Sequence, residues 1–186
     1  TLKCIAGIMT PDRGRIVLNG RELFDSEKRT DLTPQQRRVG YLFQQYALFP
    51  NMTVEQNILC GIRAGSRSEK RALAAEKLRM FRLEGLEKKY PAQLSGGQQK
   101  LVGLARGLSV NRNFFLLDEV TTGLDDHAVE KVMSYLLEMD QTLVLITHNL
   151  KYIDRMDHII LFDDGRVVAS GTYAEISKVW GELNEA

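Results

Sequence analysis

The 186-residue sequence has few cysteines, almost no net charge and no long apolar run. Two cysteines, Cys4 and Cys60, cannot form a disulfide framework, and their apolar neighbours lead us to expect buried, reduced thiols. The 25 basic and 24 acidic residues leave a net charge of +1, which gives no broad positive surface for nucleic acid. The apolar run at 143–147 is far shorter than the ~18–20 residues that span a bilayer. Disulfide-stabilised, nucleic-acid-binding and membrane-spanning classes are therefore disfavoured.

The remaining pattern is an alternation of short apolar strands with amphipathic helices. It predicts an α/β fold with a largely parallel core sheet. Strands that are wholly apolar are expected to be buried on both faces. Residues 51–95 read as a small helical lobe. The predicted strands are 15–19, 37–43, 114–118, 142–147, 158–162 and 166–170, and the predicted helices are 1–8, 54–62, 68–84, 95–108, 126–139 and 173–182.

Two acidic residues, Asp118 and Glu119, end the apolar strand FFLLDE. The carboxyl ends of parallel strands form the edge at which ligands bind in open α/β folds. Asp118 would hold Mg²⁺, through water, because Mg²⁺ prefers oxygen ligands and retains several waters. Glu119 would orient or deprotonate a water molecule. The alternative is that the two acids only cap the following turn.

The segment LSGGQ at 94–98 opens a helix. Ser95 is a favourable N-cap residue, and Gly96 and Gly97 leave the backbone N–H groups open to an anion. Gln98 adds a side-chain amide. An ordinary capped helix is the alternative, but each helical glycine costs about 1 kcal/mol relative to alanine, so the pattern favours an anion site.

Three more polar residues follow strands or turns. Gln44 ends a predicted strand, and its side-chain carbonyl could coordinate Mg²⁺ or water. His148 follows a second apolar strand, so we expect it at the same sheet edge as Asp118, where a neutral imidazole could bond a phosphate oxygen or the attacking water. Asp125 lies in a Gly-Leu-Asp turn just beyond the acids. By itself this segment predicts only a turn, and only its combination with the other motifs suggests a function.

In this order, the motifs resemble the ATP-binding subunit of an ATP-binding cassette (ABC) transporter. The resemblance covers essentially the whole chain, and LSGGQ followed about 16 residues later by an apolar strand ending in Asp-Glu carries it. It makes Gln44 the Q-loop glutamine and 94–98 the signature. It also makes Asp118 the Walker B acid, Glu119 the catalytic acid, Asp125 the D-loop acid and His148 the switch histidine.

The resemblance implies a P-loop NTPase-type (RecA-like) core sheet, formed by 1–50 and 99–186, with a helical signature subdomain inserted at 51–98. It implies ATP and Mg²⁺ as cofactors, with Asp118 and Gln44 at the metal. Two such subunits sandwich two ATP molecules. The residues reaching the nucleotide held by the second subunit would be Ser95, Gly96, Gly97, Gln98 and Asp125. Glu119, His148 and Gln44 would serve catalysis. The implied partners are that second cassette and transmembrane permease subunits, without nucleic acid, at the cytoplasmic face of the membrane.

The sequence also departs from the family pattern. The phosphate-binding loop GxxxxGK[ST] is absent from residues 1–186. In the family this loop runs into a helix like 1–8, so we expect the sequence to begin just after it and the chain alone to bind MgATP weakly. Val120 stands where many members have proline, and Lys100-Leu101 replaces the common Gln-Arg. Neither change affects the expected chemistry in an obvious way.

The transporter class stays open from sequence alone. Residues 37–58 look like importers of the molybdate, sulfate and polyamine group, whereas LDEVTTGLD at 117–125 and residues 157–176 look like exporters. Import is slightly favoured. Two other readings remain: a non-transport ABC ATPase, or a catalytically inert cassette that serves as an interaction module. The first is weakened because the roughly 50 residues between Gln44 and the signature contain no heptad repeat for a coiled coil.

Overall fold

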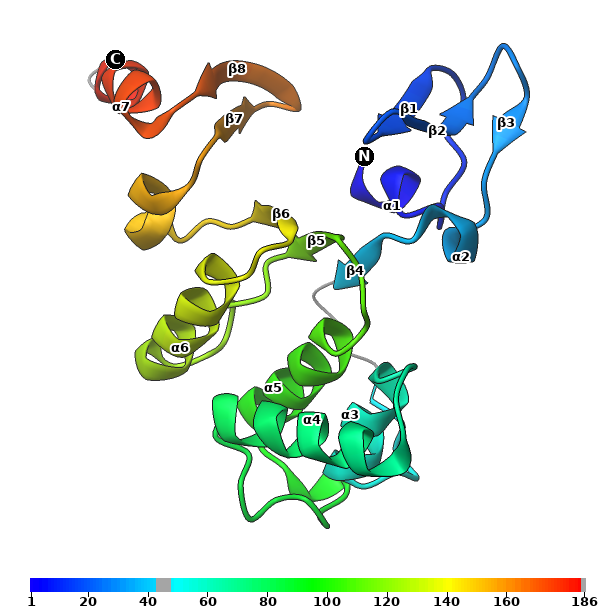
Figure 1. The fold of residues 1–186 in the computed structure, drawn as a ribbon. Helices are drawn as coiled ribbons and strands as arrows, with labels where there is room; N and C mark the ends of the chain where they lie inside the picture. The colour runs from blue at the N-terminus through cyan, green and yellow to red at the C-terminus, as the bar shows by residue number, and fades with distance from the viewer. Residues whose placement is uncertain (43–47, 185–186) are drawn as a thin grey trace. The chain divides into compact units, whose positions relative to one another are not determined.

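The computed structural model describes residues 1–42 and 48–184 and divides the chain into two compact units, residues 1–147 and 148–186 (Figure 1). Each unit is described by itself below. None of the helices in the described part of the chain combines the length and the apolar character that a membrane span requires.

The first unit begins with a short helix and an antiparallel sheet. The predicted helix over 1–8 is present only as α1 (Leu2–Ile5), because the chain turns at Gly7, whose φ is +78°. Asn19 and Gly20 both have positive φ and form the predicted hairpin turn. The sheet has the order β1-β2-β3, with β1 (Arg15–Leu18), β2 (Arg21–Asp25) and β3 (Thr30–Asp31).

The strand predicted over 37–43 is shorter and starts later. Its first residue ends a helical turn, α2 (Pro34–Arg37), because Pro34 is pre-set for the first helical position and a capping box closes the turn. Arg38 then takes a left-handed φ of 56°, which ends the helix. The strand β4 begins only after this turn (Gly40–Leu42).

Arg37 ties these N-terminal elements together. Its side chain is fully buried, and its guanidinium donates to Asp31 Oδ1 at 2.7 Å and to Leu32 O at 2.7 Å. The same group donates to the carbonyl oxygens of Cys4 and Ile5 at the end of α1. A guanidinium has five donors in a fixed fork, so one buried side chain satisfies carbonyls from separate elements.

A parallel sheet of order β4-β5-β6 forms the core of the first unit, as predicted from the alternating pattern. The central strand β5 (Phe114–Asp118) has its middle three residues buried, which confirms that prediction. The prediction that 142–147 is equally buried was wrong, because Val144 and Ile146 of β6 (Thr142–Ile146) are 38% and 40% exposed. Within the described sheet β6 pairs with β5 alone, so it is an edge strand.

Three helices pack together in the helical part of the first unit (Figure 1). They are α3 (Val54–Gly61), α4 (Arg67–Met80) and α5 (Gly96–Leu108), with the short 3-10 helix η1 (Pro91–Gln93) before α5. Val54, Ile58 and Val102 are fully buried between them. Each buried aliphatic side chain of this size contributes roughly 1.5–3 kcal/mol relative to an exposed one.

Buried polar side chains connect these helices to their surroundings. Asn57 on α3 is fully buried, accepts from Phe49 N at 2.9 Å and donates to the carbonyl of Phe49 at 3.1 Å. Lys77 on α4 donates to the hydroxyl of Tyr135 at 2.7 Å. Tyr135 lies on α6 (Asp126–Leu137). Phe81, the residue that caps the end of α4, packs edge-on against the same Tyr135 ring, so both polar and aromatic contacts join this end of α4 to α6.

The second unit contains the 3-10 helix η2 (Leu150–Arg155), the hairpin β7 (Ile159–Asp163) with β8 (Arg166–Gly171), and α7 (Tyr173–Asn184). The hairpin turns at Asp164 and Gly165, both with positive φ, where Asp-Asp-Gly predicted it. Ile176 of α7 is buried and anchors this helix.

The expectation of two buried thiols was wrong. Cys60 is exposed, and Cys4 is intermediate. Cys60 lies on α3, whose buried face is formed by Val54, Asn57 and Ile58, and apolar neighbours in sequence do not specify which face of a helix a residue occupies.

Candidate functional site

Asp118 ends β5, and a tyrosine of the neighbouring strand contacts it. Tyr41 on β4 donates its hydroxyl to Asp118 Oδ2 at 3.3 Å. Burial, and then the carboxylate of Asp118, raise the pKa of Tyr41, so its hydroxyl stays a donor at neutral pH. The contact orients a half-buried carboxylate whose second oxygen is available for a cation or its water. Sequence reasoning did not single out Tyr41.

Glu119 follows in a left-handed backbone conformation, with φ 48°. Its N–H donates to Ile146 O at 3.0 Å, and its carbonyl accepts from Thr122 N at 3.2 Å. A non-glycine residue in this conformation costs about 1–2 kcal/mol, so neighbouring contacts must hold it. The next residue, Val120, is fully buried and anchors the turn. Glu119 therefore lies just beyond the sheet, at the edge where β5 and β6 end.

Lys100 holds the same turn from α5. Its Nζ donates to Glu119 O at 3.3 Å and to Thr122 O, the two carbonyls at either end of the turn. Burial lowers the pKa of the Lys100 ammonium, against the attraction of the Glu119 carboxylate. Nothing in the sequence connects Lys100 with the acid pair, yet the structure places it on the backbone of the Glu119 turn. Its position beside the signature was visible in the sequence, but the turn it reaches is 19–22 residues away.

The signature segment forms the start of α5, as predicted. Ser95 is the N-cap, and Ser95 Oγ accepts from Gln98 N at 3.2 Å while Gln98 Oε1 accepts from Ser95 N at 3.0 Å. This reciprocal pair is a capping box. A Cβ placed on Gly96 would meet no atom within 4 Å, so open space adjoins the first turn. Exposed N–H groups with an open approach suit an oxyanion.

The Gly-Leu-Asp turn lies beside the signature. A Cβ on Gly97 would stand 3.9 Å from Leu124 Cδ2, an ordinary contact distance. The next residue, Asp125, is the N-cap of α6, and its Oδ1 accepts from Ala128 N at 2.8 Å. The structure thus brings the helix start at 95–98 and the turn at 123–125 together within the first unit.

Two predicted site residues are not placed in this arrangement. Gln44 lies outside the described residues. β6 ends beside β5, with Ile146 paired to Asp118, which is the sheet edge expected for the switch histidine. His148 follows two residues later as the first residue of the second unit.

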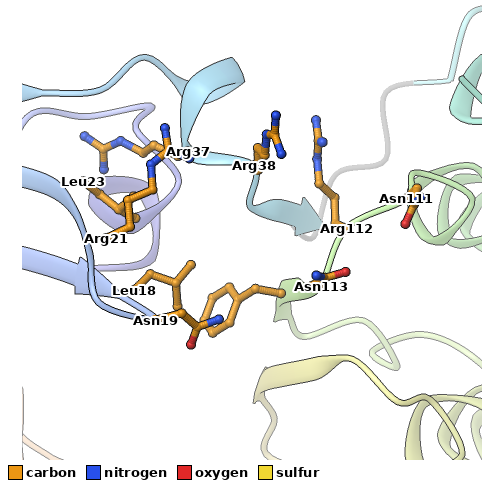
Figure 2. A pocket seen from close by; sticks show the side chains of 10 residues that line it. Leu18, Asn19, Arg21, Leu23, Arg37, Arg38, Asn111, Arg112 and Asn113 are labelled. Atoms are coloured by element: carbon orange, nitrogen blue, oxygen red, sulfur yellow. The ribbon is translucent and has the colours of Figure 1, made fainter.

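None of these site residues lines either of the two cavities found in the described part of the chain. One, of about 440 Å³, carries four arginines, of which Arg37 is the buried one already engaged with α1 and β3 (Figure 2). Phe114, the first residue of β5, lines it, so it sits at the opposite end of that strand from Asp118. The other, of about 490 Å³, lies between η2 and α7. Its lining residues are Leu150, Lys151, Ile153, Asp154, Tyr173, Ile176 and Ser177.

The family model for the ABC transporter matches residues 1–122, two thirds of the chain. The chain belongs to the ABC transporter family. This confirms the resemblance drawn from the signature and the acidic strand end. The matched range contains Asp118 and Glu119 together with the whole of 94–98.

Several curated ABC relatives are named as import ATP-binding proteins. The chain is 39% identical over 182 residues to the sulfate/thiosulfate import ATP-binding protein CysA of Thermosynechococcus vestitus, covering 94% of this chain and 52% of that protein. It is 32% identical over 179 residues to the molybdenum import ATP-binding protein ModC of Pseudomonas fluorescens, covering 94% and 50%. The chain spans about half the length of these relatives.

Solved ABC cassettes share the fold. One is a dimeric post-hydrolysis state of an ATP-binding cassette bound to ADP and Pi, with TM-score 0.76 and 31% identity over 92% of this chain and 78% of that one. A dimeric structure of the same bacterial cassette gives TM-score 0.77 and 30% identity with the same coverage. The predicted fold class, an α/β P-loop NTPase core, is confirmed.

Proposed function

We propose that this chain is the nucleotide-binding and ATP-hydrolysing part of an ABC importer. One observation carries the proposal. Within the first unit, the start of α5, with its capping box and its two glycines, lies beside the turn before α6. In the same unit, the acid pair at the end of β5 is held by Lys100 of α5 and Tyr41 of β4. Two copies arranged head to tail would then each supply a helix start to the nucleotide held by the other copy.

The residues fit MgATP as ligand. Asp118 offers carboxylate oxygens, which suit Mg²⁺, and Gln44 would add an amide oxygen. The open first turn of α5, with Gly96 unobstructed, offers N–H groups to phosphate oxygens. Bound Mg²⁺ would neutralise charge on the phosphates. Lys100 donates to the carbonyl oxygens of Glu119 and Thr122 and so holds the backbone of the turn that carries Glu119.

Within this site the chain's own groups divide the work. Tyr41 keeps the Asp118 carboxylate oriented for the metal. Glu119 would accept a proton from, or align, the attacking water. Ser95, Gly96, Gly97 and Gln98 would contact the nucleotide held by the second subunit, with Asp125 nearby. His148 would bond a phosphate oxygen or the water.

The proposed partners are a second cassette and a transmembrane permease, with the chain on the inner face of the membrane. Import is supported by the names of the relatives, which include the methionine import protein MetN of Mesorhizobium japonicum, 35% identical over 177 residues. Both solved cassettes are described as dimeric, which supports the pairing of two copies. We further propose that 51–98 acts as the helical signature subdomain within a core of 1–50 and 99–186.

The test is hydrolysis and uptake by the full-length protein. Purified with its permease and placed in vesicles, it should hydrolyse ATP only with Mg²⁺. It should also take up one of the solutes named for its relatives: sulfate or thiosulfate, molybdenum, or methionine. ATP hydrolysis without uptake of any solute would redirect the proposal to a non-transport ABC ATPase.

A further inference from the structure

A lysine next to the signature contacts the turn that carries Glu119. Lys100 is on the second turn of α5, half-buried, and donates to the carbonyl oxygens of Glu119 and Thr122. Thr122 N in turn donates to Glu119 O at 3.2 Å. One ammonium therefore closes the turn at both of its ends.

The turn requires such a contact because its backbone is costly. Glu119 has φ 48°, a left-handed conformation that is unfavourable for a residue with a Cβ. Strained backbone of this kind persists only where its surroundings over-determine it, and it gathers at functional sites. Here β6 fixes the N–H of Glu119 through Ile146 O, and Lys100 fixes its carbonyl.

The charge of Lys100 makes the contact strong. Hydrogen bonds from charged donors contribute about twice as much as neutral ones. The ammonium is partly desolvated, and the Glu119 carboxylate attracts it. A half-buried ammonium without acceptors would be unfavourable, so the two carbonyls and the lysine stabilise each other.

We propose that Lys100 is a positioning residue for Glu119: by holding the carbonyls of Glu119 and Thr122 it fixes the left-handed turn from which the carboxylate acts on water. This rests on the proposed ATPase function. Lys100 touches the backbone of the turn and takes no part in proton transfer.

The decisive variants are Lys100→Met, which keeps the apolar stem but removes the donors, and Lys100→Arg, which keeps them. In the full-length protein Lys100→Met should lower kcat for ATP hydrolysis about ten-fold while KM for MgATP stays within two-fold, since about 1.4 kcal/mol corresponds to a factor of ten. Lys100→Arg should restore most of kcat. Lys88→Met, an exposed lysine in the same unit, is the matched control and should change neither constant.

A second measurement does not depend on turnover. Without nucleotide, the N–H of Thr122 should exchange with solvent several-fold faster in Lys100→Met than in the parent, and Lys100→Arg should return it to the parent rate. An unchanged exchange rate in Lys100→Met would overturn the proposal. So would a fall in kcat that Lys100→Arg fails to rescue or that comes with an equal rise in KM. A parent protein that hydrolyses no ATP would instead overturn the proposed function, with the exchange measurement still deciding whether Lys100 holds the turn.

Discussion

The start of α5 and the turn after β5 lie in the same unit, yet they are held in different ways. At the start of α5, Ser95 and Gln98 bond each other across three residues, and both bonds are local. The Glu119 turn is held by Lys100, 19 residues away along the chain, and by Ile146 on β6. Asp118, just before the turn, is held by Tyr41, 77 residues away on β4. The start of α5 is therefore stabilised by local contacts, whereas the Glu119 turn is stabilised by tertiary contacts.

This difference has a physical consequence. A capping box satisfies helix-end donors without help from the rest of the fold, so it tolerates change elsewhere. A left-handed glutamate has an unfavourable backbone, so its geometry follows whatever surrounds it. Substitutions remote in sequence should therefore alter chemistry at the acids, whereas the start of α5 should respond mainly to its own residues.

The largest effect is expected at Glu119 itself. In the full-length protein Glu119→Gln keeps the size and hydrogen bonding of the side chain but removes the base, so ATP hydrolysis should fall at least ~10²-fold. ATP should then persist between two subunits, and an ATP-dependent dimer should elute on gel filtration. Hydrolysis at the parent rate would return Glu119 to a residue that only shapes the turn.

Asp118→Asn provides the contrast within the same acid pair. It keeps the acceptor for Tyr41 but weakens oxygen ligation of Mg²⁺, so Mg²⁺-dependent nucleotide binding should be lost and no dimer should form. A dimer identical to that of Glu119→Gln would contradict the division of roles between the two acids.

Features that depend on local contacts could be predicted from the sequence, whereas those that depend on distant contacts could not. Ser95 as an N-cap, β5 as a buried strand and the hairpin at Asp164–Gly165 rest on patterns within a few residues, and all three were predicted. Lys100 was noticed as a departure from the family, but its contact could not be predicted because the turn it reaches depends on how α5 packs near β5.

Burial was the weaker part of the prediction for a related reason. The apolar run at 142–147 looks like a doubly buried strand, but burial depends on which strands pair beside it, and β6 pairs with β5 alone in the described sheet. The boundary between α2 and β4 was missed because the left-handed conformation of Arg38 is not encoded in residue type. The positions of Asp118, Glu119 and 94–98, by contrast, were read directly from motifs.

The next effect in size is expected at Tyr41, the most distant support in sequence. Tyr41→Phe removes the donor to Asp118 Oδ2 while keeping the ring, so Mg²⁺ affinity in the presence of ATP should fall about ten-fold, the low end for loss of a residue that orients a metal ligand. Titration of ATP hydrolysis with Mg²⁺ measures it. Unchanged Mg²⁺ affinity would show that Asp118 needs no orientation from β4.

The pH dependence of this contact has a definite sign. The pKa of Tyr41 is raised by burial and by Asp118, so the protonated hydroxyl is favoured in the folded state. Its contribution to stability is fully present below the ordinary tyrosine pKa of about 10 and is lost as the pH rises through the higher folded-state pKa. Urea unfolding of the parent should therefore lose more stability across this alkaline range than unfolding of Tyr41→Phe.

A smaller effect is expected at Ser95, where the support is local. Ser95→Ala removes the acceptor for Gln98 N and should lower the free energy of unfolding by about 1 kcal/mol, measured by urea denaturation. Thr53→Ala is the matched control, because Thr53 caps α3 with the same reciprocal pair to Gln56. Both variants should lose similar stability, but only Ser95→Ala should also weaken the ATP-dependent dimer of Glu119→Gln.

The smallest change in stability is expected at Gly96, and it separates folding from function most sharply. Alanine at this first helical position meets no atom within 4 Å and is a better helix former, so Gly96→Ala should leave stability unchanged or raise it by at most about 1 kcal/mol. Its methyl group would nevertheless occupy the open space through which phosphate oxygens approach the N–H groups, so the ATP-dependent dimer of Glu119→Gln should weaken or disappear. Gly107→Ala offers the opposite control on the same helix: its Cβ would stand 2.7 Å from Leu42 Cδ2, so it should lower stability while leaving the start of α5 open. A Gly96→Ala protein that still forms the dimer at the parent ATP concentration would show that the nucleotide does not approach this helix start.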